Sequence, residues 1–196
     1  MAVNIVISPS EDVRTVSADF PFESKYLDVF GSKMHYVDEG QGETILFLHG
    51  NPAAAYLWRN IIPHVTAQAR CVAVDLIGMG KSDHPAISYT YDEQYKYLCE
   101  FIAKLGIGTN LTLFVQDWGS GLGFRWCADH PESVRALVFI EAMVRPMSYS
   151  DLPGSLKVSE WNRCFRRSSR PAQTSPARPA ERGTSPACGL NMLGSR

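Results

Sequence analysis

Four short apolar runs, each followed within two residues by a polar side chain, constrain the fold of this chain most. The runs are 44–48, 71–74, 111–115 and 137–140, and the polar residues after them are His49, Asp75, Asp117 and Glu141. Unbroken runs of this length are typical of strands that are buried on both faces of a parallel sheet. Because chemistry in such sheets gathers at the carboxyl ends of the strands, these four polar residues are the first candidates for a functional site.

A helical pattern lies between the second and third runs. Thr90 followed by Glu93 forms a capping box, and apolar residues then recur every three or four positions from Tyr91 to Leu105. Gly106 provides a helix stop. Strands that alternate with helices predict an α/β fold, with a mostly parallel sheet and flanking helices.

An additional pair of strands is expected near the N-terminus. Residues 26–30 and 34–37 have strand-like composition and flank a turn predicted at Gly31-Ser32. Since the turn is short, the two strands should form an antiparallel hairpin.

Composition excludes several classes of protein. The five cysteines are Cys71, Cys99, Cys127, Cys164 and Cys188. Their number is odd and their spacing wide, which argues against a disulfide framework or a zinc site and indicates reduced thiols of a cytoplasmic protein. No apolar run is long enough for a membrane span, and no secretory signal is expected. A formal net charge of −1 lacks the electrostatic footprint of a nucleic-acid binder.

The C-terminal end differs in composition from the rest of the chain. Residues 166–196 contain six arginines, no lysine and one acid, Glu181, so their formal charge is +5 and that of residues 1–165 is −6. Few bulky apolar residues occur there, so we expect this segment to be disordered. A basic arm for an anionic partner is one interpretation.

We favour a second interpretation of that end. Arginine without lysine, mixed with Pro, Ala, Ser and Gly, is typical of out-of-frame translation of GC-rich DNA. We therefore expect residues 157–196 to be an aberrant, frameshifted tail. Reading the encoding DNA in its neighbouring frames tests this, because one of them should restore a recognisable continuation.

The third run leads into a strand–turn–helix segment with an acid at the turn. Asp117 is followed by Trp118 and by the small residues Gly119, Ser120 and Gly121. This layout matches the nucleophile elbow of α/β-hydrolases, in which a strained turn presents one side chain above the sheet. An Asp in place of the usual Ser predicts displacement at saturated carbon through an alkyl ester. The alternative is that Asp117 only caps the following helix.

The loop after the first run supplies candidate hydrogen-bond donors. His49-Gly50-Asn51-Pro52 occupies the position from which an α/β-hydrolase contributes one backbone N–H to the oxyanion hole, the other coming from the residue after the nucleophile. Those donors would be Asn51 and Trp118. Their side chains, an amide and an indole N–H, could also hold a departing halide. A plain turn at Asn51-Pro52 is the alternative.

At this point the chain resembles the haloalkane dehalogenases, a family of the α/β-hydrolase superfamily. The resemblance covers about Phe20 to Met147. It rests on the segments 20–22 (FPF), 34–40 (MHYVDEG), 49–52 (HGNP), 56–60 (YLWRN), 75–82 (DLIGMGKS), 116–119 (QDWG) and 141–147 (EAMVRPM).

The resemblance implies an activity and a set of site residues. Asp117 would be the nucleophile, Asn51 and Trp118 the halide-binding donors, and Glu141 the acid that orients a histidine base. Asp117 would attack the halogen-bearing carbon of a haloalkane, and the histidine would then activate water to hydrolyse the alkyl ester. No metal, organic cofactor, nucleic acid or membrane would be needed.

One member of this machinery is missing from the chain. The family histidine follows the acid, after a cap domain, whereas the five histidines here are His35, His49, His64, His84 and His130. Residues 1–156 therefore read as the N-terminal part of an incomplete α/β-hydrolase core, without the cap domain and last strands. We therefore expect this chain to be unable to turn over haloalkanes.

Three alternatives stay open. Luciferases of the Renilla type are similar in the same motifs, and light emission with coelenterazine would identify them. Epoxide hydrolases also use an aspartate elbow, but Asn51 favours a halide over an epoxide. An alternative of another class is a non-catalytic, truncated remnant. The sequence leaves halide preference, chain-length preference and oligomeric state undetermined.

Overall fold

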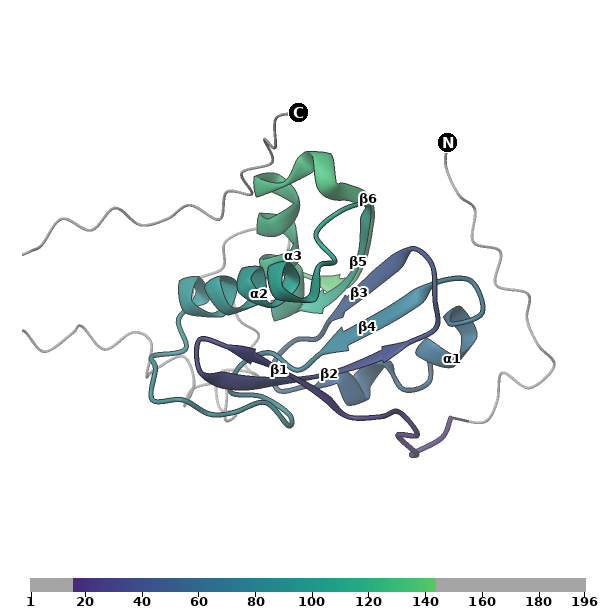
Figure 1. Ribbon diagram of the computed structural model, residues 1–196, viewed down its shortest axis with the longest axis horizontal. Coiled ribbons are helices and arrows are strands. Elements are labelled where there is room, and N and C mark those ends of the chain that lie inside the picture. The colour runs from purple at the N-terminus through teal and green to yellow at the C-terminus, as the bar shows by residue number, and fades with distance from the viewer. Residues whose placement is uncertain (1–15, 144–196) are drawn as a thin grey trace, which may run out of the picture. The chain divides into compact units, whose positions relative to one another are not determined.

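Six strands form one mixed sheet in residues 16–143, the part of the chain that the computed structural model describes. They are β1 (Lys25–Val29), β2 (Ser32–Glu39), β3 (Thr44–Leu48), β4 (Arg70–Val74), β5 (Leu111–Asp117) and β6 (Val134–Ala142), and Figure 1 shows their arrangement. Their order in the sheet is β1-β2-β4-β3-β5-β6. The pairs β1/β2 and β2/β4 are antiparallel, and β4, β3, β5 and β6 run parallel. The expected α/β class with a mostly parallel sheet is confirmed.

Helices connect the strands along the chain. They are the α-helices α1 (Ile62–Val65), α2 (Tyr91–Leu105) and α3 (Trp118–Asp129), and the short 3₁₀ helices η1 (Ala55–Trp58) and η2 (Pro131–Ser133). The predicted capping box of α2 is confirmed, since Thr90 accepts from the Glu93 N–H and the Glu93 carboxylate accepts from the Thr90 N–H. Gly106 ends the helix at φ +68, a conformation that glycine adopts without steric cost.

Replacing the capping threonine should weaken the fold measurably. Thr90→Ala removes the acceptor for the Glu93 N–H, so we expect the free energy of unfolding to fall by about 1 kcal/mol. Urea unfolding followed by circular dichroism measures this loss. The control is Thr109→Ala at an exposed position outside the helices, which should leave the unfolding midpoint unchanged. Equal stability of the two variants would contradict the prediction.

The N-terminal hairpin forms as expected, but its turn lies one residue earlier than predicted. Val29 pairs with Ser32, so the two-residue loop is Phe30-Gly31 and Ser32 belongs to β2. Both loop residues have positive φ, +53 for Phe30 and +77 for Gly31. This is the geometry of the turns whose twist matches that of an antiparallel hairpin. The sequence predicted Gly31-Ser32 as the turn because a phenylalanine such as Phe30 is uncommon at positive φ.

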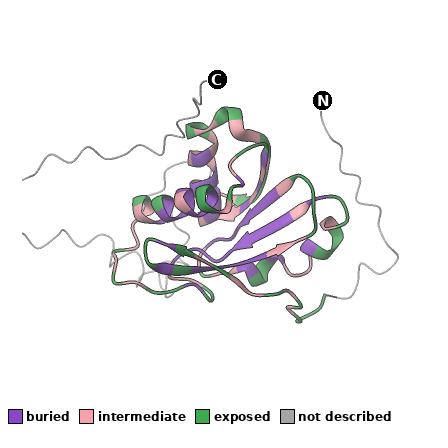
Figure 2. Cartoon of the chain, in the orientation of Figure 1, coloured by how far each residue is buried: buried purple, intermediate pink, exposed green. Residues whose placement is uncertain are grey.

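The sheet separates two hydrophobic clusters. The larger includes residues of α2 and α3 on one face, and the smaller includes residues of η1 and α1 on the other. Figure 2 shows the buried residues concentrated in the central strands β3 and β4. The prediction of burial on both faces holds for these two strands and is wrong for β6, in which Val138, Phe139 and Ile140 are exposed. Within residues 16–143, β6 pairs on one side, with β5.

Several expectations lie outside the described residues. These are the domain boundary at 156/157, the disordered and frameshifted tail, and the cysteines Cys164 and Cys188. Within residues 16–143, Cys71 and Cys127 are free thiols. No helix in this described part is long and apolar enough to cross a membrane.

Candidate active site

Asp117 is the last residue of β5 and is followed directly by α3, so the chain turns sharply at this residue. Its backbone has φ +49 and ψ −122, a conformation that is uncommon for a residue with a side chain. Asp117 occupies the N-cap position of α3, yet its side chain makes no capping hydrogen bond. The Ser120 hydroxyl instead donates to the Asp117 carbonyl oxygen. The structure therefore disfavours a capping role for this carboxylate and has the strand–turn–helix geometry of an elbow.

The carboxylate of Asp117 turns toward the loop after β3. Its Oδ1 accepts a hydrogen bond of 2.9 Å from the Asn51 N–H. This backbone donor was expected to serve an oxyanion hole, and here it holds the carboxylate itself. The contact engages Oδ1, so the other carboxylate oxygen, Oδ2, is the candidate nucleophile.

Two glycines allow this close approach. A Cβ atom on Gly50 would lie 2.3 Å from the Asp117 side chain, and one on Gly119 would lie 2.5 Å from the Leu48 carbonyl oxygen. Real Cβ atoms do not approach other atoms so closely, so both positions require glycine for steric reasons. The loop of Gly50 and the start of α3 are thereby packed against the same end of β3 and β5.

Glu141 lies at the end of β6, beside the end of β5. The pairing of β5 with β6 shifts here: Gln116 is opposite Ile140 and Asp117 is opposite Ala142, so Glu141 is the extra residue of a β-bulge. Its φ is +47. Bulges change the direction of a side chain and are common beside active sites. Asp117 and Glu141 thus both have a positive φ at neighbouring strand ends.

Trp118 is the first residue of α3, directly after Asp117. Its ring packs edge-on against that of Tyr91, with centroids 5.9 Å apart. The Tyr91 hydroxyl in turn donates to the Gly121 carbonyl oxygen over 2.8 Å. These contacts fix the indole between α2 and α3. Sequence reasoning did not anticipate Tyr91 as its packing partner, because the apolar spacing of α2 marks this tyrosine only as a core-facing residue.

His49 has a structural role in this loop. It is fully buried, its Nδ1–H donates to the Gly50 carbonyl oxygen over 2.7 Å, and its Nε2 accepts from the Leu76 N–H over 3.0 Å. Both ring nitrogens are therefore occupied, with one donating and the other accepting. Burial holds the pKa of His49 below its usual value, so the ring is neutral at pH 7. The His49 ring is therefore unavailable as a general base.

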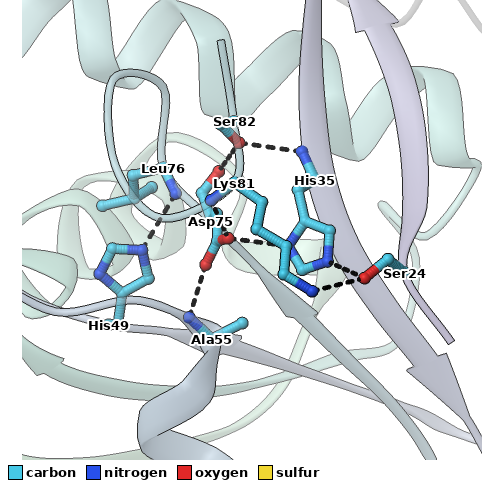
Figure 3. Close-up of polar contacts among 8 residues, drawn as sticks. All are labelled: Ser24, His35, His49, Ala55, Asp75, Leu76, Lys81 and Ser82. Atoms are coloured by element: carbon cyan, nitrogen blue, oxygen red, sulfur yellow. Dashed lines mark hydrogen bonds and ion pairs between the residues drawn. The ribbon is translucent and has the colours of Figure 1, made fainter. Parts of the chain in front are cut away.

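Asp75, the second of the four strand-end residues, forms a buried polar network with residues of other segments (Figure 3). Its Oδ2 accepts from His35 Nδ1 (2.7 Å) and from the Lys81 N–H (2.8 Å), and its Oδ1 accepts from the Ala55 N–H (2.6 Å). Burial alone would raise the pKa of Asp75, but these hydrogen bonds outweigh it and hold the pKa below the usual value. Spacing alone gave no sign of this partnership with His35, because 40 residues separate the pair.

The network fixes both sides of the loop that carries Asn51. His49, before the loop, accepts from Leu76, the residue after Asp75, and Ala55, after the loop, donates to the Asp75 carboxylate. Asp75 is thus a structural residue, and of the four strand-end residues only Asp117 and Glu141 have exposed or half-buried side chains beside each other.

The remaining histidines make no hydrogen bond to Asp117 or Glu141. His64 and His84 are exposed, and His130 caps the end of α3, where its ring stacks on Trp126 at 4.8 Å. His130 therefore has a role at the helix end and not beside Asp117. Among the described residues, no group of three His, Cys, Asp or Glu side chains could hold a metal ion.

Comparisons with known proteins identify the fold family of the chain. Residues 43–190 match the family model of the alpha/beta hydrolase fold. A haloalkane dehalogenase of Sphingobium indicum is 46% identical over 138 residues, which is 68% of this chain and 47% of the relative. One of Mycolicibacterium smegmatis is 42% identical over 133 residues, which is 66% of this chain and 43% of the relative.

Solved structures give the same result. The haloalkane dehalogenase DbeA of Bradyrhizobium elkani has a TM-score of 0.66 at 41% identity, with 74% of this chain and 50% of that chain covered. DatA of Agrobacterium tumefaciens has a TM-score of 0.64 at 38% identity, with 68% and 45% covered. The chain spans about half the length of the curated relatives it matches.

Proposed function

Because the chain belongs to the α/β-hydrolase fold family, and its named relatives are haloalkane dehalogenases, we propose that it contains the alkylation half of a haloalkane dehalogenase site. The observation that carries the proposal is Asp117, presented on a strained elbow with one carboxylate oxygen held by the Asn51 N–H. The names of these relatives favour a carbon–halogen bond as the target over a luciferin or an epoxide.

The geometry suits a displacement by Asp117. With Oδ1 held by Asn51, the Oδ2 oxygen attacks the halogen-bearing carbon of a haloalkane. A carbon–oxygen ester bond forms, the carbon–halogen bond breaks, and the halide leaves with the bonding electron pair. The side chains of Asn51 and Trp118 serve as neutral donors to the departing halide.

Hydrolysis of the ester needs a second group. Glu141 is the acid that would orient a histidine, and no histidine follows it within the 196 residues. His49, which follows β3 at the same edge of the sheet, already uses both ring nitrogens. We therefore propose that this chain forms the ester on Asp117 and does not release it.

Intact-mass spectrometry of the 196-residue chain exposed to 1-bromobutane tests this proposal. We expect one butyl group per chain, a release of about one bromide per chain, and a peptide map that places the butyl group on Asp117. Continued bromide release would show that another group activates water. The absence of any adduct would refute alkylation by this chain.

A further inference from the structure

Gln116 is the β5 residue directly before Asp117, and its side chain joins two other elements. Its Oε1 accepts from the Gly50 N–H over 3.2 Å, and its Nε2 donates to the Glu141 Oε2 over 2.9 Å. The amide oxygen can only accept and the amide nitrogen can only donate, so these two partners determine which way the amide faces.

Both partners of Gln116 lead to groups of the proposed site. Gly50 precedes Asn51, whose N–H holds the Asp117 carboxylate. Glu141 has an exposed side chain at a bulge, and within residues 16–143 the Gln116 amide supplies its one side-chain hydrogen bond. An exposed carboxylate with a single hydrogen bond depends on that bond for its direction.

We infer that Gln116 is a positioning residue, which ties the Glu141 carboxylate and the Asn51 loop into one unit around Asp117. The inference rests on the proposed alkylation of Asp117 and assigns a role to a residue that touches neither substrate nor halide. It deepens the proposed function, because the same amide would orient the acid in any form of this site that contains a histidine base.

Three variants separate positioning from simple packing. Gln116→Met keeps the length of the side chain and loses both hydrogen bonds. Gln116→Glu keeps the acceptor for Gly50 and places a second carboxylate against Glu141. The double variant Gln116→Glu with Glu141→Gln exchanges the two side chains, so that an amide donor again meets a carboxylate acceptor at unchanged net charge.

The single variant Gln116→Glu makes the interaction between position 116 and Glu141 depend on pH. Two carboxylates at hydrogen-bond distance share one proton, so one of them titrates above the usual range for Glu. Among residues 16–143, the other titratable side chains at the carboxyl ends of the parallel strands are His49 after β3, Asp75 after β4 and Asp117 in β5. At low pH the shared proton restores a donor to Glu141, and at high pH the two charges repel each other.

The experiment measures the rate of butyl ester formation by the full chain with 1-bromobutane, between about pH 5 and 8. We expect Gln116→Met to react roughly tenfold more slowly than the unmodified chain at every pH. Gln116→Glu should lose rate as the pH rises, while the double variant should lose that pH dependence. Amide NMR spectra verify that each variant is folded.

The outcomes are distinguishable. Single variants that match the unmodified chain at every pH would overturn the inference, as would a double variant that keeps the pH dependence of Gln116→Glu. If the unmodified chain forms no ester, the proposed function fails, and the Gly50 amide resonance then decides the inference. That resonance should titrate in Gln116→Glu and stay constant in the double variant, and a constant resonance in both would refute the contact.

Discussion

Asp117→Asn should abolish ester formation with 1-bromobutane. The amide oxygen is a far weaker nucleophile than a carboxylate, so we expect the rate to fall by at least about 10³-fold. Among residues with a side chain, Asn is one of those that tolerate positive φ best, so the strained turn at φ +49 should persist and the variant should fold. The Asn51 N–H can still donate to the side-chain oxygen of the new residue.

The measurement is the rate at which the butyl adduct appears by intact mass. Asp19→Asn, a matched change at an exposed carboxylate far along the chain, should leave that rate unchanged. An adduct that persists at the original rate in Asp117→Asn, or that maps to Glu141, would show that another carboxylate is the nucleophile.

Asp75→Asn should have the largest effect on stability. It leaves His35 Nδ1 facing an amide instead of a carboxylate, in a place where both partners are about 1% exposed. Losing one partner of such a buried pair costs about 3 kcal/mol of unfolding free energy. Urea unfolding at pH 7 measures the difference between the variant and the unmodified chain.

The pH dependence of this difference has a defined sign. The pKa of Asp75 is lower in the folded protein than the ordinary value of 3.8, so its contribution to stability is present above about pH 4 and is lost as the pH falls through the folded pKa. The stability gap between the two proteins should therefore be widest at neutral pH and narrow below about pH 4. Asp92→Asn, at a carboxylate that is 82% exposed, should show a gap below about 1 kcal/mol at every pH. A gap for Asp75→Asn that is constant with pH would contradict the assignment.

The elements that local chemistry determines could be predicted from the sequence. The boundaries of α2 follow from Thr90 and Gly106, and β3 from an apolar run that ends at Leu48. The elbow at Asp117 was predictable because a strand must end there and three small residues follow it. These features depend on residues that are neighbours in sequence.

The contacts between distant segments could not be predicted in this way. The pairing of His35 with Asp75 spans 40 residues, and the bridge from Gly50 through Gln116 to Glu141 joins three separate strand ends. The bulge at Glu141 is a matter of register between β5 and β6, which depends on how both strands pack rather than on the composition of either.

The hydrogen bond between Asn51 and Asp117 has a consequence for how the chain folds. It joins residues 66 positions apart, across two parallel strands whose pairing requires closing a long segment of chain. Contacts of such large sequence separation form slowly, because loop-closure entropy is lost before they contribute any stabilisation. Recovery of ester formation during refolding should therefore lag behind the recovery of α2, which forms from local contacts. The time at which alkylation recovers then reports the last stage of sheet assembly.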